Sequence, residues 1–101
     1  RFMEKGVKLD AVFCASGDMT AVGVMDSAKK HGMKIPDDLA VIGFDDSTTA
    51  AFLNPPLTTI RQPIERIGAE ALDAAVAAID GKIKEFRHVL IEPELIIRKS
   101  A

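Results

Sequence analysis

The chain has 101 residues, which is enough for one small domain or for part of a larger one. Hydrophobic residues make up 48% and charged residues 28%, a composition that is typical of a folded domain and excludes a disordered chain. The formal net charge of −2 provides no basic surface for a nucleic-acid backbone or an anionic membrane. The chain begins at Arg1 rather than Met, so we expect a fragment.

Three apolar runs predict strands, at residues 11–15, 39–44 and 57–61. The first two are continuous, which is typical of strands that are buried on both faces of a parallel sheet. Two further strands are predicted at 86–91 and 95–98, because a turn of Glu and Pro residues separates two apolar stretches there.

Helices are predicted between these strands. Val22, Met25 and Ala28 recur at helical spacing, and Gly32 marks the end of that helix. A short helix is expected at 48–53, capped by Ser47.

A longer helix is expected to begin at Pro63 and to end at Gly81. Its apolar stripe consists of Ile64, Ile67, Ala71, Leu72, Ala75 and Ile79. The alternation of strands and helices predicts an α/β fold with a parallel sheet and right-handed crossovers. The pair Gln62-Pro63, where a strand ends and a helix starts, is the best candidate for a hinge.

Polar side chains directly follow three predicted strands, at the ends where an open α/β sheet binds ligands. Asp45 is the main candidate for a ligand contact, because an ionised carboxylate accepts hydrogen bonds from two adjacent hydroxyls or ring N–H groups. The alternative is that Asp45 or Asp46 caps the next short helix, and we assign this capping role to Asp46.

Three other polar residues allow two interpretations each. Gln62 suits a sugar hydroxyl or a base edge because it both donates and accepts, or it bonds to its own backbone as a loop residue. Asp18 either contacts a ligand or, more commonly for this position, caps a helix. Arg61 is expected to pair with a carboxylate in a missing part of the chain or to be a solvated strand end.

The sequence does not indicate catalysis. It contains no GxGxxG, phosphate-binding or GxSxG motif. Cys14, the single cysteine, lies in an apolar run and is expected to be buried and inert, while His31 and His88 have no partner at metal-ligand spacing. A Mg²⁺-dependent phosphotransferase using Asp45 and Asp46 is a distant alternative, because no phosphate cradle accompanies them. We expect no enzyme activity, no metal and no cofactor.

Five stretches have a distinctive amino-acid sequence. They are DAVFCA at 10–15, DMTAVG at 18–23, IPDDLAVIGFDD at 35–46, PPLTTIRQP at 55–63 and ELIIRKS at 94–100. In this order and spacing they cover nearly the whole chain and resemble the LacI/GalR (lactose-repressor) family of bacterial transcription regulators.

The resemblance implies a type I periplasmic-binding-protein-like effector domain of two α/β lobes, of which this chain is the last part. Residues 1–62 would form the C-terminal lobe, 63–92 would cross to the N-terminal lobe, and 93–101 would return as a strand. Such domains bind a sugar, nucleoside or purine between the lobes. The ligand biases the lobe arrangement, which controls a helix-turn-helix head on operator DNA. That head would be absent from this chain.

The resemblance also implies particular site residues. Asp45 corresponds to the ligand-contacting Asp of the GFDD motif, and Gln62 corresponds to a cleft-facing Gln. Ser16 and Asp18 are further candidates, although the turn that contains them is one residue longer than in relatives. A homodimer is implied, with contacts through Val22, Met25, Asp26, Phe52 and Leu53.

We therefore predict the effector-sensing part of a cytoplasmic, homodimeric DNA-binding regulator whose ligand is a sugar or a purine-like molecule. The apolar runs are too short to span a bilayer, so no membrane contact is expected. The alternative is a periplasmic sugar-binding protein of a transport system. The dimer segment before the prolines favours the regulator.

Overall fold

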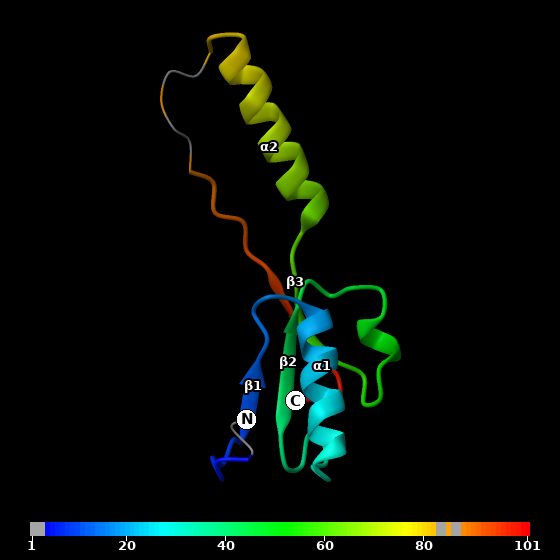
Figure 1. Cartoon of the computed structure of the whole chain (residues 1–101). Helices are drawn as coiled ribbons and strands as arrows, with labels where there is room; N and C mark the ends of the chain where they lie inside the picture. The colour runs from blue at the N-terminus through cyan, green and yellow to red at the C-terminus, as the bar shows by residue number, and fades with distance from the viewer. Residues whose placement is uncertain (1–3, 83–84, 86–87) are drawn as a thin grey trace. The chain divides into compact units, whose positions relative to one another are not determined.

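A computed structural model of the chain describes residues 4–82, 85 and 88–101 (Figure 1). These residues form two units, which are treated separately below. The first unit comprises residues 1–61 and 95–101, and the second comprises 62–94. The first unit contains most of the sheet. Of the predicted ligand residues, Gln62 lies in the second unit and the others lie in the first.

Three strands of the first unit are parallel neighbours: β1 (Ala11–Phe13), β2 (Ala40–Phe44) and β3 (Thr58–Arg61). In this register Val12 lies opposite Val41, and Gly43 lies opposite Thr59. The α/β architecture and the parallel pairing predicted from the apolar runs are confirmed, with strand limits one or two residues shorter than predicted.

The fourth strand, β4 (Glu94–Ile96), joins the sheet beside β3. Just after it, the Arg98 backbone N–H donates to Thr58 Oγ1 at 2.8 Å and the Ser100 N–H donates to the Pro56 carbonyl at 3.0 Å. The partner's number falls as the chain advances, which is the antiparallel sense. The sheet is therefore mixed. Residues 88–91 form no strand, contrary to prediction, and residues 86 and 87 lie outside the described part.

The helix α1 (Asp18–Lys30) lies against one face of the strands (Figure 1). It carries an acidic residue, Asp18, in its first turn, and basic residues, Lys29 and Lys30, in its last turn, which suits the helix dipole. Its buried apolar side chains are Ala21, Met25 and Ala28, as their spacing predicts.

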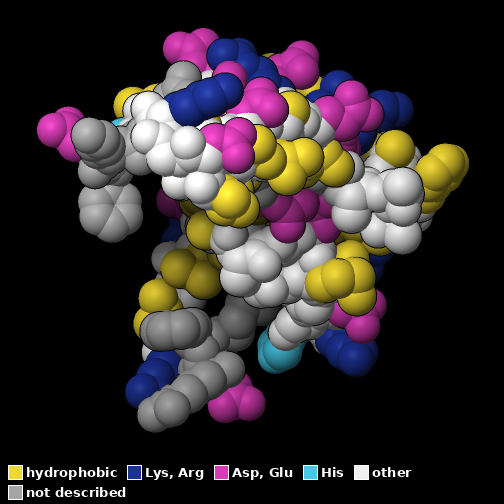
Figure 2. Space-filling model, turned by 90° about the horizontal axis from the view of Figure 1, so that it is seen from above, with side chains coloured by type: hydrophobic (Ala, Val, Ile, Leu, Met, Phe, Trp, Pro, Cys, Tyr) yellow, Lys and Arg dark blue, Asp and Glu magenta, His cyan; other side chains and the backbone are white. Residues whose placement is uncertain are grey.

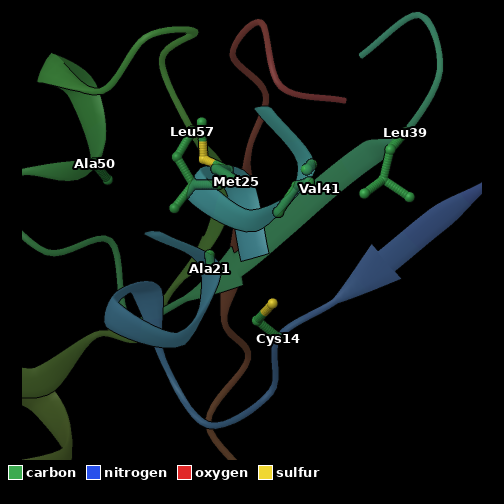
Figure 3. Close-up of a cluster of buried hydrophobic side chains, with 8 residues drawn as sticks. Cys14, Ala21, Met25, Leu39, Val41, Ala50 and Leu57 are labelled. Atoms are coloured by element: carbon green, nitrogen blue, oxygen red, sulfur yellow. The ribbon is translucent and has the colours of Figure 1, made fainter. Parts of the chain in front are cut away.

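Figure 3 shows a cluster of buried apolar side chains, to which α1 and β2 contribute. Its members are Cys14, Ala21, Met25, Ala28, Leu39, Val41, Ala50 and Leu57. Burial raises the pKa of the Cys14 thiol, which disfavours the reactive thiolate.

The expectation that the first two strands are buried on both faces is wrong for the described residues. In β2 only Val41 and Gly43 are buried, while the alternate residues are half-buried. Phe13 of β1 is 53% exposed and packs edge-on against the Phe44 ring, with centroids 6.4 Å apart. The cause is that α1 covers one face only, and nothing else among the described residues buries the other.

The segment after β2 contains a short 3₁₀ helix, η1 (Ala50–Phe52), where a helix was predicted at 48–53. Thr49 precedes it, and within the described residues no side chain caps it. Ser47 is therefore not its side-chain cap. Its hydroxyl instead bonds to the Thr49 hydroxyl at 3.1 Å.

The second unit consists mainly of α2 (Ile64–Ile79), which follows Pro63 as predicted. None of its residues is buried among the described part of the chain. Ile64, Leu72 and Ile79 are all largely exposed. Figure 2 shows hydrophobic side chains at the surface, interspersed with acidic and basic ones. No described helix combines the length and the apolar character needed to cross a bilayer.

Candidate functional site

The candidate site is the edge of the sheet where the parallel strands end. Residues 16–18, 45–47 and Arg61 lie at the carboxyl ends of β1, β2 and β3. Direct contacts join these segments, as described below, so the predicted convergence of polar groups is present in the first unit.

Asp45 is exposed and is the first residue after β2. Its backbone N–H donates to the Ile60 carbonyl at 2.8 Å, and its φ of 100° is in the region that favours glycine. Its Oδ2 lies 3.4 Å from where a Cβ of Gly17 would be. Because Gly17 has no side chain, the carboxylate fits closely against the start of α1, at the edge where a ligand would bind.

The Asp46 carboxylate is paired with two arginines. Its Oδ2 accepts from Arg61 Nε and its Oδ1 accepts from Arg98 Nη2, both at 2.8 Å. Its side chain is 9% exposed. Asp46 is therefore not a helix cap, and Arg61 finds its carboxylate within this chain rather than in a missing part. Arg98 was not singled out from the sequence, because it lies 52 residues from Asp46 and no local pattern connects them.

Asp18 is 3% exposed and uses both carboxylate oxygens internally. Oδ1 accepts from the Thr59 hydroxyl at 2.7 Å, and Oδ2 accepts from the Ser47 backbone N–H at 2.6 Å. Within the described residues α1 has no side-chain cap, so Asp18 is not its cap, and its ligand contact stays a prediction. It joins the ends of β2 and β3 to the start of α1.

Ser16 and Gln62 remain predictions as ligand contacts. Ser16 is exposed, and its hydroxyl is hydrogen-bonded to the Thr20 hydroxyl at 2.8 Å, one turn along the chain. Gln62 is half-buried and begins the second unit, where its carbonyl accepts from the Ile64 N–H at 2.9 Å.

The residues predicted for a dimer contact occupy one region of the first unit. Val22, Met25, Asp26 and Leu53 help to line a hollow of about 90 Å³. Phe52, next to it in the chain, is 87% exposed. Met25 is 4% exposed and belongs to the buried apolar cluster, so little of its side chain is available for a contact with a second copy.

The described residues contain no cluster of three or more His, Cys, Asp or Glu side chains that could hold a metal ion. At the carboxyl-end edge of the sheet, the Asp18 carboxylate accepts from Ser47 and the Asp46 carboxylate accepts from Arg61. The arrangement suits reversible recognition of a polar molecule by hydrogen bonds.

The Asp46 ion pairs predict a pH dependence of stability. Burial by itself would raise the pKa of the Asp46 carboxyl, but hydrogen bonds and charges from Arg98 and Arg61 outweigh it and lower the pKa below its usual value. A depressed pKa in the folded state stabilises the fold above the unfolded pKa near 4, and this stability is lost as the pH falls through that value and below. We expect wild type to lose stability between pH 6 and pH 3, and Asp46→Asn to remove the part of this loss that comes from the Asp46 ion pairs.

Urea unfolding of the protein that contains this chain, at several pH values, measures this difference. Asp37→Asn is the matched control, because Asp37 is exposed and the described residues give it no ion pair or hydrogen bond. An identical pH dependence in wild type and Asp46→Asn would contradict the prediction.

Comparisons with known proteins agree with this fold. The family described as "Periplasmic binding protein-like domain" matches residues 3–101. A repressor from Histophilus somni, "HTH-type transcriptional repressor PurR", is 43% identical over 90 residues, which are 89% of this chain and 27% of that protein.

Two solved structures are similar over 98% of this chain. "Transcriptional regulator CelR-cellobiose complex" has a TM-score of 0.90, 33% identity and 30% of its length covered. The Lac repressor dimer bound to operator and the anti-inducer ONPF has a TM-score of 0.88, 27% identity and 29% of its length covered. The chain thus spans about a quarter to a third of the length of the proteins it matches.

Proposed function

Because this chain belongs to the periplasmic binding protein-like domain family, and matches the part of it found in LacI-type transcriptional regulators, we propose that it is the last part of a regulator's effector-sensing domain. The observation that carries the proposal is the Asp45 carboxylate. It is exposed at the carboxyl end of β2 and lies against Gly17 at the start of α1.

The effector is a sugar or a purine-like small molecule. Adjacent hydroxyls of a sugar, or the N–H groups of a purine, are donors that one carboxylate can accept together. Relatives support the sugar class, since one is solved with cellobiose and another, from Lactobacillus casei, with bound sucrose and with bound glucose. Gln62, Ser16 and Asp18 are proposed as further ligand contacts, although both Asp18 oxygens already accept hydrogen bonds within the protein.

The intact protein is proposed to be a cytoplasmic homodimer that binds operator DNA through a head outside this chain. The Lac repressor dimer bound to operator supports this arrangement. Phe52, Leu53, Val22 and Asp26 are the proposed contacts, since a two-fold interface would bury the exposed Phe52 ring. No bond-making step is needed, because a ligand acts by favouring one of two arrangements. The named relatives are transcriptional regulators, which argues against a transport binding protein.

Operator release tests the proposal. A DNA site is first selected from random sequences with the intact protein, and its affinity is then measured by fluorescence anisotropy with cellobiose, sucrose, glucose, adenosine or hypoxanthine. We expect at least one compound to change the affinity by about tenfold or more. A scrambled DNA site is the control. The proposal fails if no DNA site is enriched and calorimetry detects no binding of any of these compounds.

A further inference from the structure

The turn that carries Asp45 has an unusual backbone. Asp45 has a φ of 100° and Asp46 a φ of 49°, so two consecutive residues with side chains adopt positive φ. Positive φ is energetically unfavourable for L-residues, so it persists only where surrounding contacts hold the backbone in place. The direction of the Asp45 carboxylate therefore depends on what holds this turn.

Three consecutive backbone amides of the turn donate hydrogen bonds to other elements. The N–H of Asp45 donates to the Ile60 carbonyl at 2.8 Å, and that of Asp46 donates to Thr59 Oγ1 at 3.2 Å. The N–H of Ser47 donates to the buried Asp18 carboxylate at 2.6 Å. The acceptors come from β3 and from the first residue of α1, so this part of the turn is tied to two different elements.

The Asp46 side chain adds a second set of ties. Its two oxygens accept from Arg61 and Arg98, each at 2.8 Å, and Arg98 also donates to the Leu57 carbonyl at 2.8 Å through Nη1. Charge-assisted bonds of this length are stronger than bonds between neutral groups. Arg61 is the last residue of β3, and Arg98 follows β4, so one carboxylate joins the segment that leaves the first unit to the segment that returns to it.

We propose that Asp46, Arg61 and Arg98 form a positioning clamp that holds the strained turn and thereby aims the Asp45 carboxylate at the ligand. The inference rests on the proposed function of Asp45. Asp46 contributes by orienting its neighbour and does not touch the ligand. The Asp46 oxygens are occupied by two arginines, and the exposed Asp45 lies beside Gly17 at the carboxyl end of β2.

Asp46→Asn in the intact protein tests the clamp. Asn keeps the size of the side chain and tolerates positive φ, so the change removes the charge and one acceptor without adding backbone strain. We expect hydrogen–deuterium exchange of peptides covering residues 44–48 to become about tenfold faster. The assay in the previous section uses a panel of five compounds: cellobiose, sucrose, glucose, adenosine and hypoxanthine. For the compound of this panel that the wild-type protein binds, the affinity of Asp46→Asn should be about tenfold lower.

Two further variants separate positioning from general destabilisation. Arg98→Gln should also lower the affinity, and the double variant should lose less than the sum of the two single losses, because the Asp46–Arg98 contact is removed in both. Asp37→Asn should change neither readout. Operator affinity without ligand should stay within about twofold of wild type in every variant, since the fold is intact.

Three results would overturn the clamp. One is exchange at residues 44–48 that Asp46→Asn leaves unchanged. Another is faster exchange with unchanged ligand affinity, which leaves Asp46 a purely structural role. The third is additive losses in the double variant. If wild type binds no member of the panel and selects no DNA site, the proposed function fails by itself. The exchange rates of residues 44–48 then decide alone whether the clamp holds the turn.

Discussion

Replacing Asp45 with alanine is expected to weaken effector binding by the intact protein by 100-fold or more and to abolish the response of operator binding to effector. The carboxylate is exposed at the carboxyl end of β2, where it can accept two charge-assisted hydrogen bonds from the ligand. Removing both bonds costs about 3 kcal/mol, which corresponds to a factor of roughly 100 in affinity. Isothermal titration calorimetry and the operator-release assay measure the two effects.

The backbone at Asp45 calls for a second variant. At a φ of 100° alanine is strained, whereas glycine adopts this conformation readily. Asp45→Gly therefore removes the same carboxylate without the strain and should lose the same affinity. Asp37→Ala is the control for loss of an exposed acidic side chain. Effector affinity close to wild type in Asp45→Gly would refute Asp45 as a ligand contact.

Gly43→Ala is expected to lower the free energy of unfolding by about 3 kcal/mol, the upper end of the cost of overpacking. A Cβ on Gly43 would lie 2.3 Å from Asp18 Oδ1 and 2.8 Å from Leu57 Cδ2. Neither neighbour moves easily, because Asp18 is held by Thr59 and Ser47 and Leu57 is completely buried. The clash would thus also disturb the turn that follows β2. Urea unfolding of the intact protein measures the change.

Gly23→Ala is the matched control. Gly23 lies within α1, and a Cβ there would meet nothing within 4 Å. Alanine in an exposed helix interior stabilises by about 0.5–1 kcal/mol relative to glycine. The two substitutions are chemically identical and should have opposite signs. If both changed stability equally, the close approach of Asp18 to the β2 backbone would not matter for folding.

Much of the fold follows from local patterns in the sequence. The apolar runs predict β1, β2 and β3, and helical spacing predicts α1 and α2, because each pattern depends on residues only a few positions apart. The motifs likewise indicated the family that the comparisons identify. The edge of the sheet where Asp45 lies follows from the same order of elements, since parallel strands end at one edge.

The predictions were wrong where the answer depended on distant partners. Continuous apolar runs indicated strands covered on both faces, but within the described residues α1 covers one face, and Phe13 stays half exposed. The residues of a strand do not show which element, if any, packs on the second face of the sheet. The strand predicted at 86–91 is absent from residues 88–91, which have no sheet neighbour among the described residues.

The roles of neighbouring acidic residues show the same division most clearly. The sequence alone determined that Asp18, Asp45 and Asp46 come after strands, at the edge of the sheet where the parallel strands end. Only the tertiary structure decided which donors reach the Asp18 and Asp46 carboxylates. The physical reason is that a carboxylate's role depends on the donors that reach it, and those of Asp18 and Asp46 come from 15 to 52 residues away in the chain, brought near by strand pairing.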